Sequence, residues 1–340
     1  MRQPVNSELK PTLLRGTREG EQVTKPSRTD TKEYGPNFEK SSLELTKAGP
    51  ANTDTYRDTQ GLTSLEFGDR SASSIHNVLY LHGFPGSGLE ARILDSFARE
   101  RCARITAFDR PGFGASLAPR LMRGTIAEIG VAIAAGMRER GIESYSIIAV
   151  SGGAPYALAV SRAAPGAVTR VVLVSGISEL SHKGALAGMV TQNKVILSVG
   201  RWAPLLVRPL VHYIANGWRR NPRGMVRSLA RMLDGEDREI LSDPVFTKPF
   251  AESMERAVLT VSEGPYQELR RLLRRWPLDL RAIRTEVKVF HGMEDRYVPL
   301  AHGEWISKQL TNSSLTALPG RGHFMAARIA EQMLDAAIVS

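Results

Sequence analysis

The chain has a single cysteine, Cys102, among its 340 residues. One thiol cannot close an internal disulfide, so a disulfide framework is excluded and redox chemistry is not expected. Cysteine scarcity of this kind is typical of proteins in a reducing compartment. We expect an ordinary hydrophobic core to hold the fold, and 42% hydrophobic residues are enough to build one.

Long apolar runs are also missing. Residues 71–89 and 144–161 contain no Asp, Glu, Lys or Arg, but Ser, Gly and Pro interrupt both stretches. Neither is the continuous apolar segment that a membrane span requires. The N-terminal region has no run of signal-peptide type, and its glutamates do not suit a mitochondrial transit peptide. We therefore expect no membrane span and a cytoplasmic location.

Acidic residues are fewer than basic ones, which gives a formal net charge of +10. Residues 179–284 hold 18 Lys and Arg against 11 Asp and Glu. Aromatic residues are only 6% of the chain and do not interleave with the basic ones, as they do where bases stack on a protein. A solvated basic helical face accounts for the excess, and we expect no nucleic-acid partner.

The order of apolar patterns indicates an α/β fold. Residues 1–50 show no sustained apolar period, so they are predicted to be a flexible N-terminal extension. A hairpin is predicted around the turn at Thr59 to Gly61. Strands follow at 77–83, 103–110, 145–150, 168–176, 286–292 and 313–320, and helices lie between most of them. This alternation predicts a mostly parallel central sheet with helices on both faces, and a core of residues 51–176 and 285–340.

Residues 177–284 break this alternation. They contain no strand candidate, are rich in Leu, Met, Arg and Trp, and are interrupted by several prolines. We interpret this segment as an all-helical cap inserted after the sixth strand. Arg223, Arg227 and Arg231 recur every four residues and predict the solvated face of an amphipathic helix. Some of its Trp, Met and Tyr side chains are candidates for lining an apolar pocket, although core packing explains them equally well.

Ser151 marks the end of one predicted strand and the start of a helix. The sequence reads "YSIIAV", then the serine, then "GGAPYALAVSRAA". In a parallel sheet, functional groups gather at the carboxyl ends of the strands. Gly152 and Gly153 suit a tight turn that presents a nucleophile, because they bring no Cβ close to it. Taken alone, Ser151 is also a good helix N-cap.

These residues resemble the nucleophile turn of the α/β-hydrolase superfamily, whose pattern is G-x-S-x-G; Ala149 stands here in place of the first glycine. "HGMEDRYVP" at 291–299 resembles the family's acid loop and implies Asp295. "LPGRGHFMA" at 318–326 resembles its histidine loop and implies His323. "LHGFPGSG" at 81–88 resembles the loop whose backbone N–H, here that of Phe84, joins the N–H of Gly152 in an oxyanion hole. "FDRPGFGAS" at 108–116 resembles a further signature of the family.

Other residues compete for these roles. Glu294 is the nearest rival of Asp295 but stands one residue early for the family's spacing, and Glu179 is a weaker rival after the sixth strand. His82 and His291 are expected to hold their loops rather than to act in catalysis. No spacing of histidines and acids suggests a metal site, and no cofactor is expected.

The resemblance implies a serine hydrolase that cleaves a carboxylic ester, a lactone or a related acyl substrate through an acyl-enzyme. A serine in place of an aspartate argues against the epoxide hydrolases and haloalkane dehalogenases of the same fold. The sequence also resembles carbon–carbon bond hydrolases, haloperoxidases and proline iminopeptidases. Acyl transfer by the same three residues, or small-molecule binding without catalysis, remain the alternatives. The expected partner is a partly apolar small molecule; the oligomeric state is open.

Overall fold

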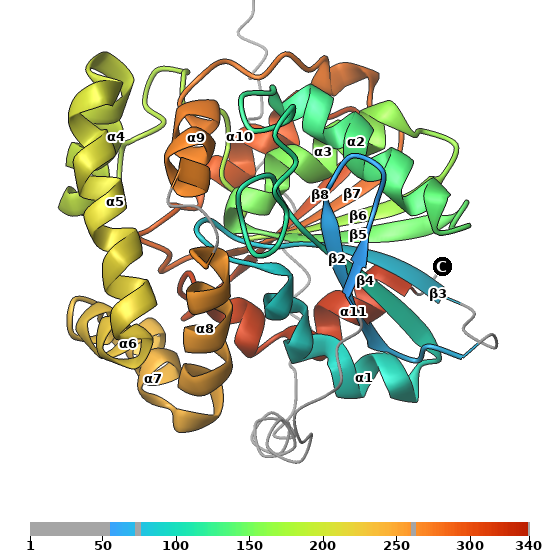
Figure 1. Ribbon diagram of the computed structural model, residues 1–340, viewed down its shortest axis with the longest axis horizontal. Coiled ribbons are helices and arrows are strands. Elements are labelled where there is room, and N and C mark those ends of the chain that lie inside the picture. Colours follow the sequence, from blue (N-terminus) through green and yellow to red (C-terminus); the bar gives the residue numbers. More distant parts are fainter. Residues whose placement is uncertain (1–54, 72–75, 260–262, 339–340) are drawn as a thin grey trace, which may run out of the picture. The chain divides into compact units, whose positions relative to one another are not determined.

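Eight strands form one sheet in the computed structural model, which describes residues 55–71, 76–259 and 263–338 (Figure 1). The predicted extension at 1–50 lies outside the described residues. The strand order is β1 (Thr55–Arg57), β2 (Thr63–Gly68), β4 (Ala103–Asp109), β3 (His76–Leu81), β5 (Tyr145–Val150), β6 (Val168–Val174), β7 (Glu286–Gly292) and β8 (Ser313–Leu318). β1 and β2 pair antiparallel, as predicted for the hairpin, and β2 pairs antiparallel with β4. All other neighbours are parallel.

Both faces of the sheet are buried beneath helices (Figure 1). The helices α2 (Ile126–Glu139), α3 (Ala154–Ala163) and α10 (Ala301–Gln309) cover one face, and α1 (Asp95–Glu100) and α11 (Ala330–Ile338) cover the other. Consecutive residues of β5 point to opposite faces, so Ile147 packs in the core cluster beside α2 and α3 while Ile148 packs beside α1 and α11. This two-sided burial explains the nearly unbroken apolar character of the central strands.

Helix α2 shows how the local sequence determines where a helix begins and which side of it is buried. Thr125 and Glu128 form a reciprocal capping box at its start. Three or four residues separate Ile126, Ile129, Ile133 and Met137, which are all buried, so one stripe of the helix faces the sheet.

Six α-helices lie between β6 and β7 in the part of this segment that the structure describes, and they lie together beyond one end of the sheet (Figure 1). They are α4 (Thr191–Trp202), α5 (Pro204–Arg220), α6 (Pro222–Arg231), α7 (Gly235–Ser242), α8 (Pro244–Ala257) and α9 (Glu263–Leu272), and we call them the helical insertion. Pro204, Pro222 and Pro244 each stand in the first turn of a helix, where no N–H partner is lost. The predicted all-helical insertion after the sixth strand is confirmed; its exact limits, 177 and 284, stay a prediction.

Charged side chains anchor the insertion to the rest of the fold. Arg256 of α8 forms an ion pair with buried Asp109 at the end of β4, at 2.8 Å. Glu268 of α9 pairs at 2.6 Å with Arg110, and both side chains are fully buried. Because a buried charge is tolerated only when it is paired, these contacts fix where α8 and α9 sit.

Candidate active site

Ser151 occupies a strained turn between β5 and α3. Its backbone φ is +51°, a left-handed conformation that costs energy for a residue with a Cβ. It opens a short 3₁₀ turn, η4 (Ser151–Gly153), and its side chain is 8% exposed. The turn lies at the carboxyl end of a central parallel strand, as the sequence predicted.

Two glycines allow this turn to pack tightly. A Cβ on Gly153 would stand 2.3 Å from the carbonyl oxygen of Leu81, at the end of β3. A Cβ on Gly152 would stand 2.6 Å from the Cβ of Phe84 and 3.1 Å from its backbone nitrogen. Both approaches are too close for a larger residue, so Gly152 and the N–H of Phe84 lie side by side next to Ser151.

Ala149 takes the place of the first glycine of the family's pattern. It is the fifth residue of β5, lies opposite Leu81 and Leu173 on the neighbouring strands, and is fully buried in the core. Its methyl group therefore belongs to the packed face of the sheet and not to the turn.

Asp295 and His323 meet at the ends of β7 and β8. The Nδ1 atom of His323 lies 2.8 Å from Oδ2 of Asp295. The other carboxylate oxygen, Oδ1, accepts the backbone N–H groups of Tyr297 and Val298 at 2.9 and 2.8 Å. Gly292 lets the two loops approach, because a Cβ there would stand 2.3 Å from the carbonyl oxygen of Arg321. One carboxylate thus joins the acid loop to the histidine.

His323 has a perturbed pKa. Burial alone would lower the pKa of this imidazole, but the charge of Asp295 and its hydrogen bond outweigh burial. Asp237 and Glu90 add to the effect, and the pKa of His323 is raised above its ordinary value. A histidine that gains stability on protonation is well suited to receive a proton.

The structure distinguishes Asp295 from Glu294 and Glu179, the other candidates for the acid that contacts His323. Glu294, the adjacent residue, has an exposed side chain. Glu179 accepts the backbone N–H of Trp276 at 2.9 Å and the hydroxyl of Ser181. Of the three acids, only Asp295 bonds to His323 among the described residues.

The remaining histidines near the site hold loops, as predicted. The Nδ1 atom of His82 lies 2.8 Å from the carbonyl oxygen of Gly83, and its Nε2 accepts the backbone N–H of Arg110. Arg110 donates in turn to the carbonyl oxygens of His82 and Gly83 at 2.5 and 2.8 Å. The Nε2 atom of His291 lies 2.7 Å from the carbonyl oxygen of Val298. His82 and Arg110 together therefore fix the loop that carries Phe84, and His291 holds the acid loop.

Helix α7 holds the histidine loop, a contact that sequence reasoning missed. Asp237 accepts the backbone N–H groups of His323 at 2.9 Å and Phe324 at 2.8 Å. The neighbouring Glu236 accepts the N–H of Gly322 at 3.1 Å and pairs with Arg321. No local pattern signals these bonds, because the partners stand more than eighty residues apart in the chain.

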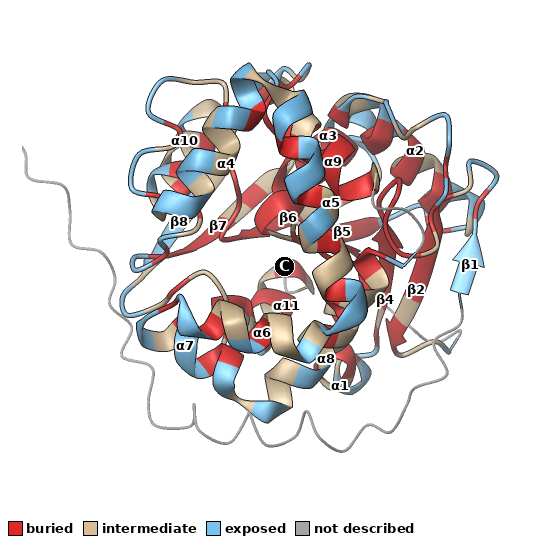
Figure 2. Ribbon diagram, turned by 60° about the vertical axis from the view of Figure 1, so that its left-hand side comes forward, coloured by how far each residue is buried: buried red, intermediate tan, exposed pale blue. Residues whose placement is uncertain are grey.

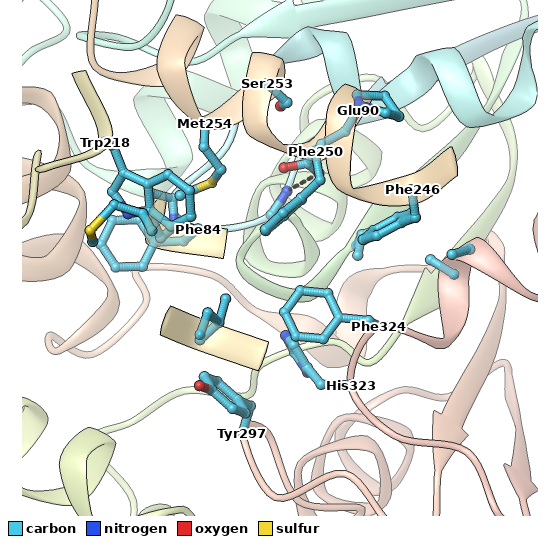
Figure 3. A pocket seen from close by; sticks show the side chains of 18 of the residues that line it. Phe84, Glu90, Trp218, Phe246, Phe250, Ser253, Met254, Tyr297, His323 and Phe324 are labelled. Carbon is cyan, nitrogen blue, oxygen red and sulfur yellow. Dashed lines mark hydrogen bonds between the residues drawn. The ribbon is translucent and has the colours of Figure 1, made fainter. Parts of the chain in front are cut away.

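An apolar cavity of about 480 Å³ opens in front of His323 (Figure 3). The rings of Phe246, Phe250 and Phe324 gather on one side of it, and Trp218 and Phe84 lie on another. A second cavity of about 240 Å³ is lined by Ser151 and Gly152. Walls common to both are formed by Phe84, Pro85, Asn193, Ile196, Ile214, Trp218 and Tyr297.

The Trp, Met and Tyr residues of 177–284 that are candidates for lining a pocket divide into three groups. Trp218 and Met189 line these cavities. Trp276 packs edge-on against Trp305 in the core. Trp202 and Tyr213 are exposed, at 83% and 77%.

Glu90 is the only acidic residue among the described residues that line the larger cavity, and sequence reasoning missed it as well. Its Oε2 accepts the N–H of Gly83 at 2.8 Å. Burial raises the pKa of Glu90 to about 7, although the Gly83 hydrogen bond, Arg110 and His323 act in the opposite direction. A Cβ on Gly83 would lie 3.7 Å from the Cβ of Ser151 and 3.6 Å from Oε2 of Glu90, so this carboxyl group stands close to the serine turn.

Ser151 and His323 line adjacent cavities, but in this conformation no hydrogen bond joins them among the described residues. Hydrogen bonds between a nucleophile and its base are often long without substrate and tighten when substrate binds. The structure thus brings together Asp295 with His323, and Ser151 with Gly152 and Phe84. The catalytic roles of these five residues stay predictions.

The family model of the alpha/beta hydrolase family matches residues 78–336 of this chain. The chain belongs to the alpha/beta hydrolase family. The match covers the sheet from β3 onward together with the helical insertion, and the predicted family and fold are confirmed.

Solved structures of this fold resemble the chain over most of its length. An alpha/beta hydrolase fold protein from Nakamurella multipartita is 21% identical with a TM-score of 0.58, over 84% of this chain and 99% of that one. An esterase from Exiguobacterium antarcticum is 16% identical with a TM-score of 0.60, over 84% and 97%. A bromoperoxidase from Bacillus anthracis is 16% identical with a TM-score of 0.61, over the same shares. At these identities the likeness shows the fold alone.

A curated relative matches a shorter stretch. The dihydrolipoyllysine-residue acetyltransferase component of the acetoin cleaving system from Cupriavidus necator is 32% identical over 124 residues, which is 36% of this chain. The match covers 33% of that relative, so the chain spans about a third of its length.

The described residues offer neither a candidate metal site nor a membrane-spanning helix. They contain no group of three or more His, Cys, Asp or Glu that could hold a metal ion. Every helix among them is too short or too polar to cross a bilayer.

Proposed function

We propose that this member of the alpha/beta hydrolase family is a serine hydrolase that cleaves a carboxylic ester, a lactone or a related acyl substrate. The observation that carries the proposal is the arrangement at neighbouring strand ends. A serine in a strained turn stands beside the Gly152 and Phe84 N–H groups. The Asp295–His323 hydrogen bond lies at the carboxyl ends of β7 and β8, on the same edge of the sheet. The apolar walls of the cavity suit a substrate with a hydrocarbon or aromatic portion.

In the proposed mechanism Ser151 Oγ attacks the carbonyl carbon while Nε2 of His323 takes its proton. Nδ1–H of His323 donates to Asp295, which holds the ring in the correct tautomer and stabilises its charged form. The N–H groups of Gly152 and Phe84 would bind the oxyanion. His323 then gives the proton to the leaving oxygen, and a water molecule, activated by the same imidazole, releases the acid and frees Ser151.

The helical insertion is proposed to act as a cap, with limits at 177 and 284. Residues from α4, α5, α6 and α8 line the larger cavity, which supports a role in selecting the substrate. Closing the cavity against water would also strengthen the electrostatic interactions inside it.

The decisive experiment is active-site labelling. A fluorophosphonate probe should form one adduct, at Ser151, and Ser151→Ala should lose both the adduct and nearly all p-nitrophenyl ester turnover. A fall in turnover of roughly 10⁴-fold or more is expected when a triad nucleophile is removed. Labelling at another residue, or turnover that survives in Ser151→Ala, would remove the proposed mechanism.

Acyl transfer is a second candidate, because the curated relative from Cupriavidus necator is named an acetyltransferase component. The same acyl-enzyme would pass its acyl group to an alcohol or thiol instead of water. Adding such acceptors to the ester assay distinguishes the two: acyl transfer gives the new ester or thioester as the main product, whereas hydrolysis gives the free acid.

A further inference from the structure

The outer side of α4 and α5 carries an unusual number of exposed apolar side chains. Trp202 is 83% exposed, Tyr213 77%, Leu205 74% and Leu206 72%. Val195, Val199 and Leu210 are also exposed. Figure 2, in which this side comes toward the reader, shows exposed turns along both helices. We call these seven residues the outer apolar face.

Their spacing makes the face continuous along each helix. On α4 the positions 195, 199 and 202 follow at intervals of four and three, and on α5 the positions 206, 210 and 213 do the same. Residues at such intervals lie on one side of a helix. Helix α5 buries a different stripe, Val207, Val211, Ala215 and Trp218, against the rest of the protein. The exposed residues are therefore a second apolar surface and not the edge of the core.

The charged residues carried by α4, α5 and α6 have one sign. Residues 191–233, which span α4, α5 and α6, contain eight Lys and Arg and no Asp or Glu. Lys194, Arg201 and Arg208 alternate with the apolar positions of α4 and α5, and all three are exposed. Arg208 is paired with Glu263 at 3.0 Å, but Lys194 has no ion-pair partner within the described part of the chain. An occupant of this face must accept apolar side chains and supply negative charge.

A second copy of the chain does not meet this condition. In a two-fold dimer the same patch would face itself, which would bring the basic residues of α4 and α5 against each other without adding acids beyond the Glu263 that already pairs with Arg208. An acidic protein would satisfy the charges, but a partner protein usually receives protruding anchors in a matching pocket near a polar rim. Large aliphatic and aromatic side chains that project from a basic helical surface are typical of helices that lie on membranes.

The inner sides of α4 and α5 give a functional reason for a membrane on the outer apolar face. Gln192, Asn193 and Ile196 of α4 and Ile214 and Trp218 of α5 line the apolar cavity in front of His323. A membrane on the outer apolar face would be separated from this cavity by α4 and α5 only. Partly apolar substrates concentrate in bilayers, so the location suits their delivery.

We propose that the outer apolar face of α4 and α5 docks this protein on the surface of a bilayer that contains anionic lipids. Trp202, Leu205, Leu206 and Tyr213 enter the boundary between headgroups and acyl chains. Lys194, Arg201 and Arg208 contact the lipid phosphates and carboxylates. The proposal concerns a surface and does not depend on the reaction at Ser151.

The test is flotation of the full chain with vesicles of phosphatidylcholine and with vesicles of equimolar phosphatidylcholine and phosphatidylserine. The chain should float with the anionic vesicles, and raised salt should weaken its binding. The double variant Trp202→Glu/Leu206→Glu should reduce the partition coefficient by roughly a hundredfold, because two large apolar side chains are lost from the boundary. Lys194→Gln/Arg201→Gln should reduce it by roughly tenfold or more, and only on anionic vesicles.

Val131→Glu is the matched control, because Val131 is 58% exposed on α2, a helix outside the insertion. Its partition coefficient should equal that of the unaltered chain, and circular dichroism and thermal unfolding should show that every variant folds. The proposal is overturned if the full chain stays with neither vesicle, or if Trp202→Glu/Leu206→Glu floats as well as Val131→Glu. It is also overturned if that double variant only converts a dimer to a monomer, which would assign the face to a second copy.

Discussion

Asp295 uses its two carboxylate oxygens for two different tasks. One accepts two backbone N–H groups and so fixes the carboxylate in its loop, while the other faces His323. The charge of Asp295 is also the largest influence that raises the pKa of that histidine. Because Asp295 positions the imidazole and stabilises its charged form, we expect activity to depend on each atom of this carboxylate.

Asp295→Asn is therefore expected to lower kcat for ester hydrolysis by roughly 10³-fold or more, since an amide can hold the wrong tautomer of the imidazole. Glu294→Gln is the control, because the Glu294 side chain is exposed and should leave kcat within about twofold of the original value. Steady-state kinetics on a p-nitrophenyl ester measures both. A larger loss in Glu294→Gln than in Asp295→Asn would transfer the role to Glu294.

The pKa of His323 predicts the acid side of the pH profile. The imidazole must be neutral to accept a proton, and its pKa is raised above the ordinary value of about 6.5. The value of kcat/KM should therefore rise with pH through a midpoint above about 6.5. Glu90 contributes to the raised pKa, so Glu90→Gln should move this midpoint to lower pH. A profile for Glu90→Gln that stays in place, or moves to higher pH, would contradict the electrostatic assignment.

Among the elements, α7 belongs to the helical insertion and also forms hydrogen bonds to the backbone of the histidine loop. Asp237 accepts the N–H groups of His323 and Phe324, and its carboxylate fills the space beside Gly322, where a Cβ would stand 2.3 Å from it. Burial raises the pKa of Asp237, with the two N–H groups acting against that effect. We therefore expect this helix to position His323, the proposed base.

Asp237→Ala should reduce kcat by roughly 10- to 100-fold with little change in KM, because a small displacement of the imidazole disturbs its reactive geometry more than substrate binding. Asp237→Asn keeps one acceptor and should recover part of the loss. Glu239→Ala, an exposed position on the same helix, serves as the control. If Asp237→Ala raises KM alone, or changes stability alone, the positioning role is wrong.

The sequence predicted the elements and their order because these follow from local patterns. The runs at 145–150 and 286–292 match β5 and β7, and the spacing of the apolar residues in 126–137 indicates the buried stripe of α2. Gly152 and Gly153 predict a tight turn, because a glycine has no Cβ to prevent close packing. The close approach of Gly153 to Leu81 confirms this reason. Asp237 and Glu90 were not predictable, because their partners lie on other elements and no periodic signal marks them. Exposed Trp202 and buried Trp218 likewise carry the same local signal, and only the packing distinguishes them.

At the scale of the whole molecule, a fully buried ion pair helps to join the helical insertion to the sheet. Arg110 follows β4 and Glu268 belongs to α9; both are fully buried and lie 2.6 Å apart. The hydroxyl of Tyr156 and the guanidinium of Arg271 donate to the second oxygen of Glu268, at 3.0 and 3.2 Å. Four side chains from three parts of the chain thus satisfy each other in the interior.

Glu268→Gln should lower the free energy of unfolding by roughly 3–5 kcal/mol, because it leaves the charges of Arg110 and Arg271 without their buried counterion. Glu252→Gln breaks a partly exposed pair with Arg92 and should cost less than about 1 kcal/mol. Urea unfolding monitored by circular dichroism compares the two variants. Equal losses would mean that burial does not set the strength of the Arg110–Glu268 pair.

The bonds from α7 to the histidine loop also restrict how the enzyme can open. An outward movement of α7 would pull on the backbone of Gly322 and His323, so opening the protein along this side would also displace the proposed base. An entrance between α4 and α5 leaves those bonds intact. If the proposed function is right, substrate entry along that route would leave the proposed base in place for the next turnover.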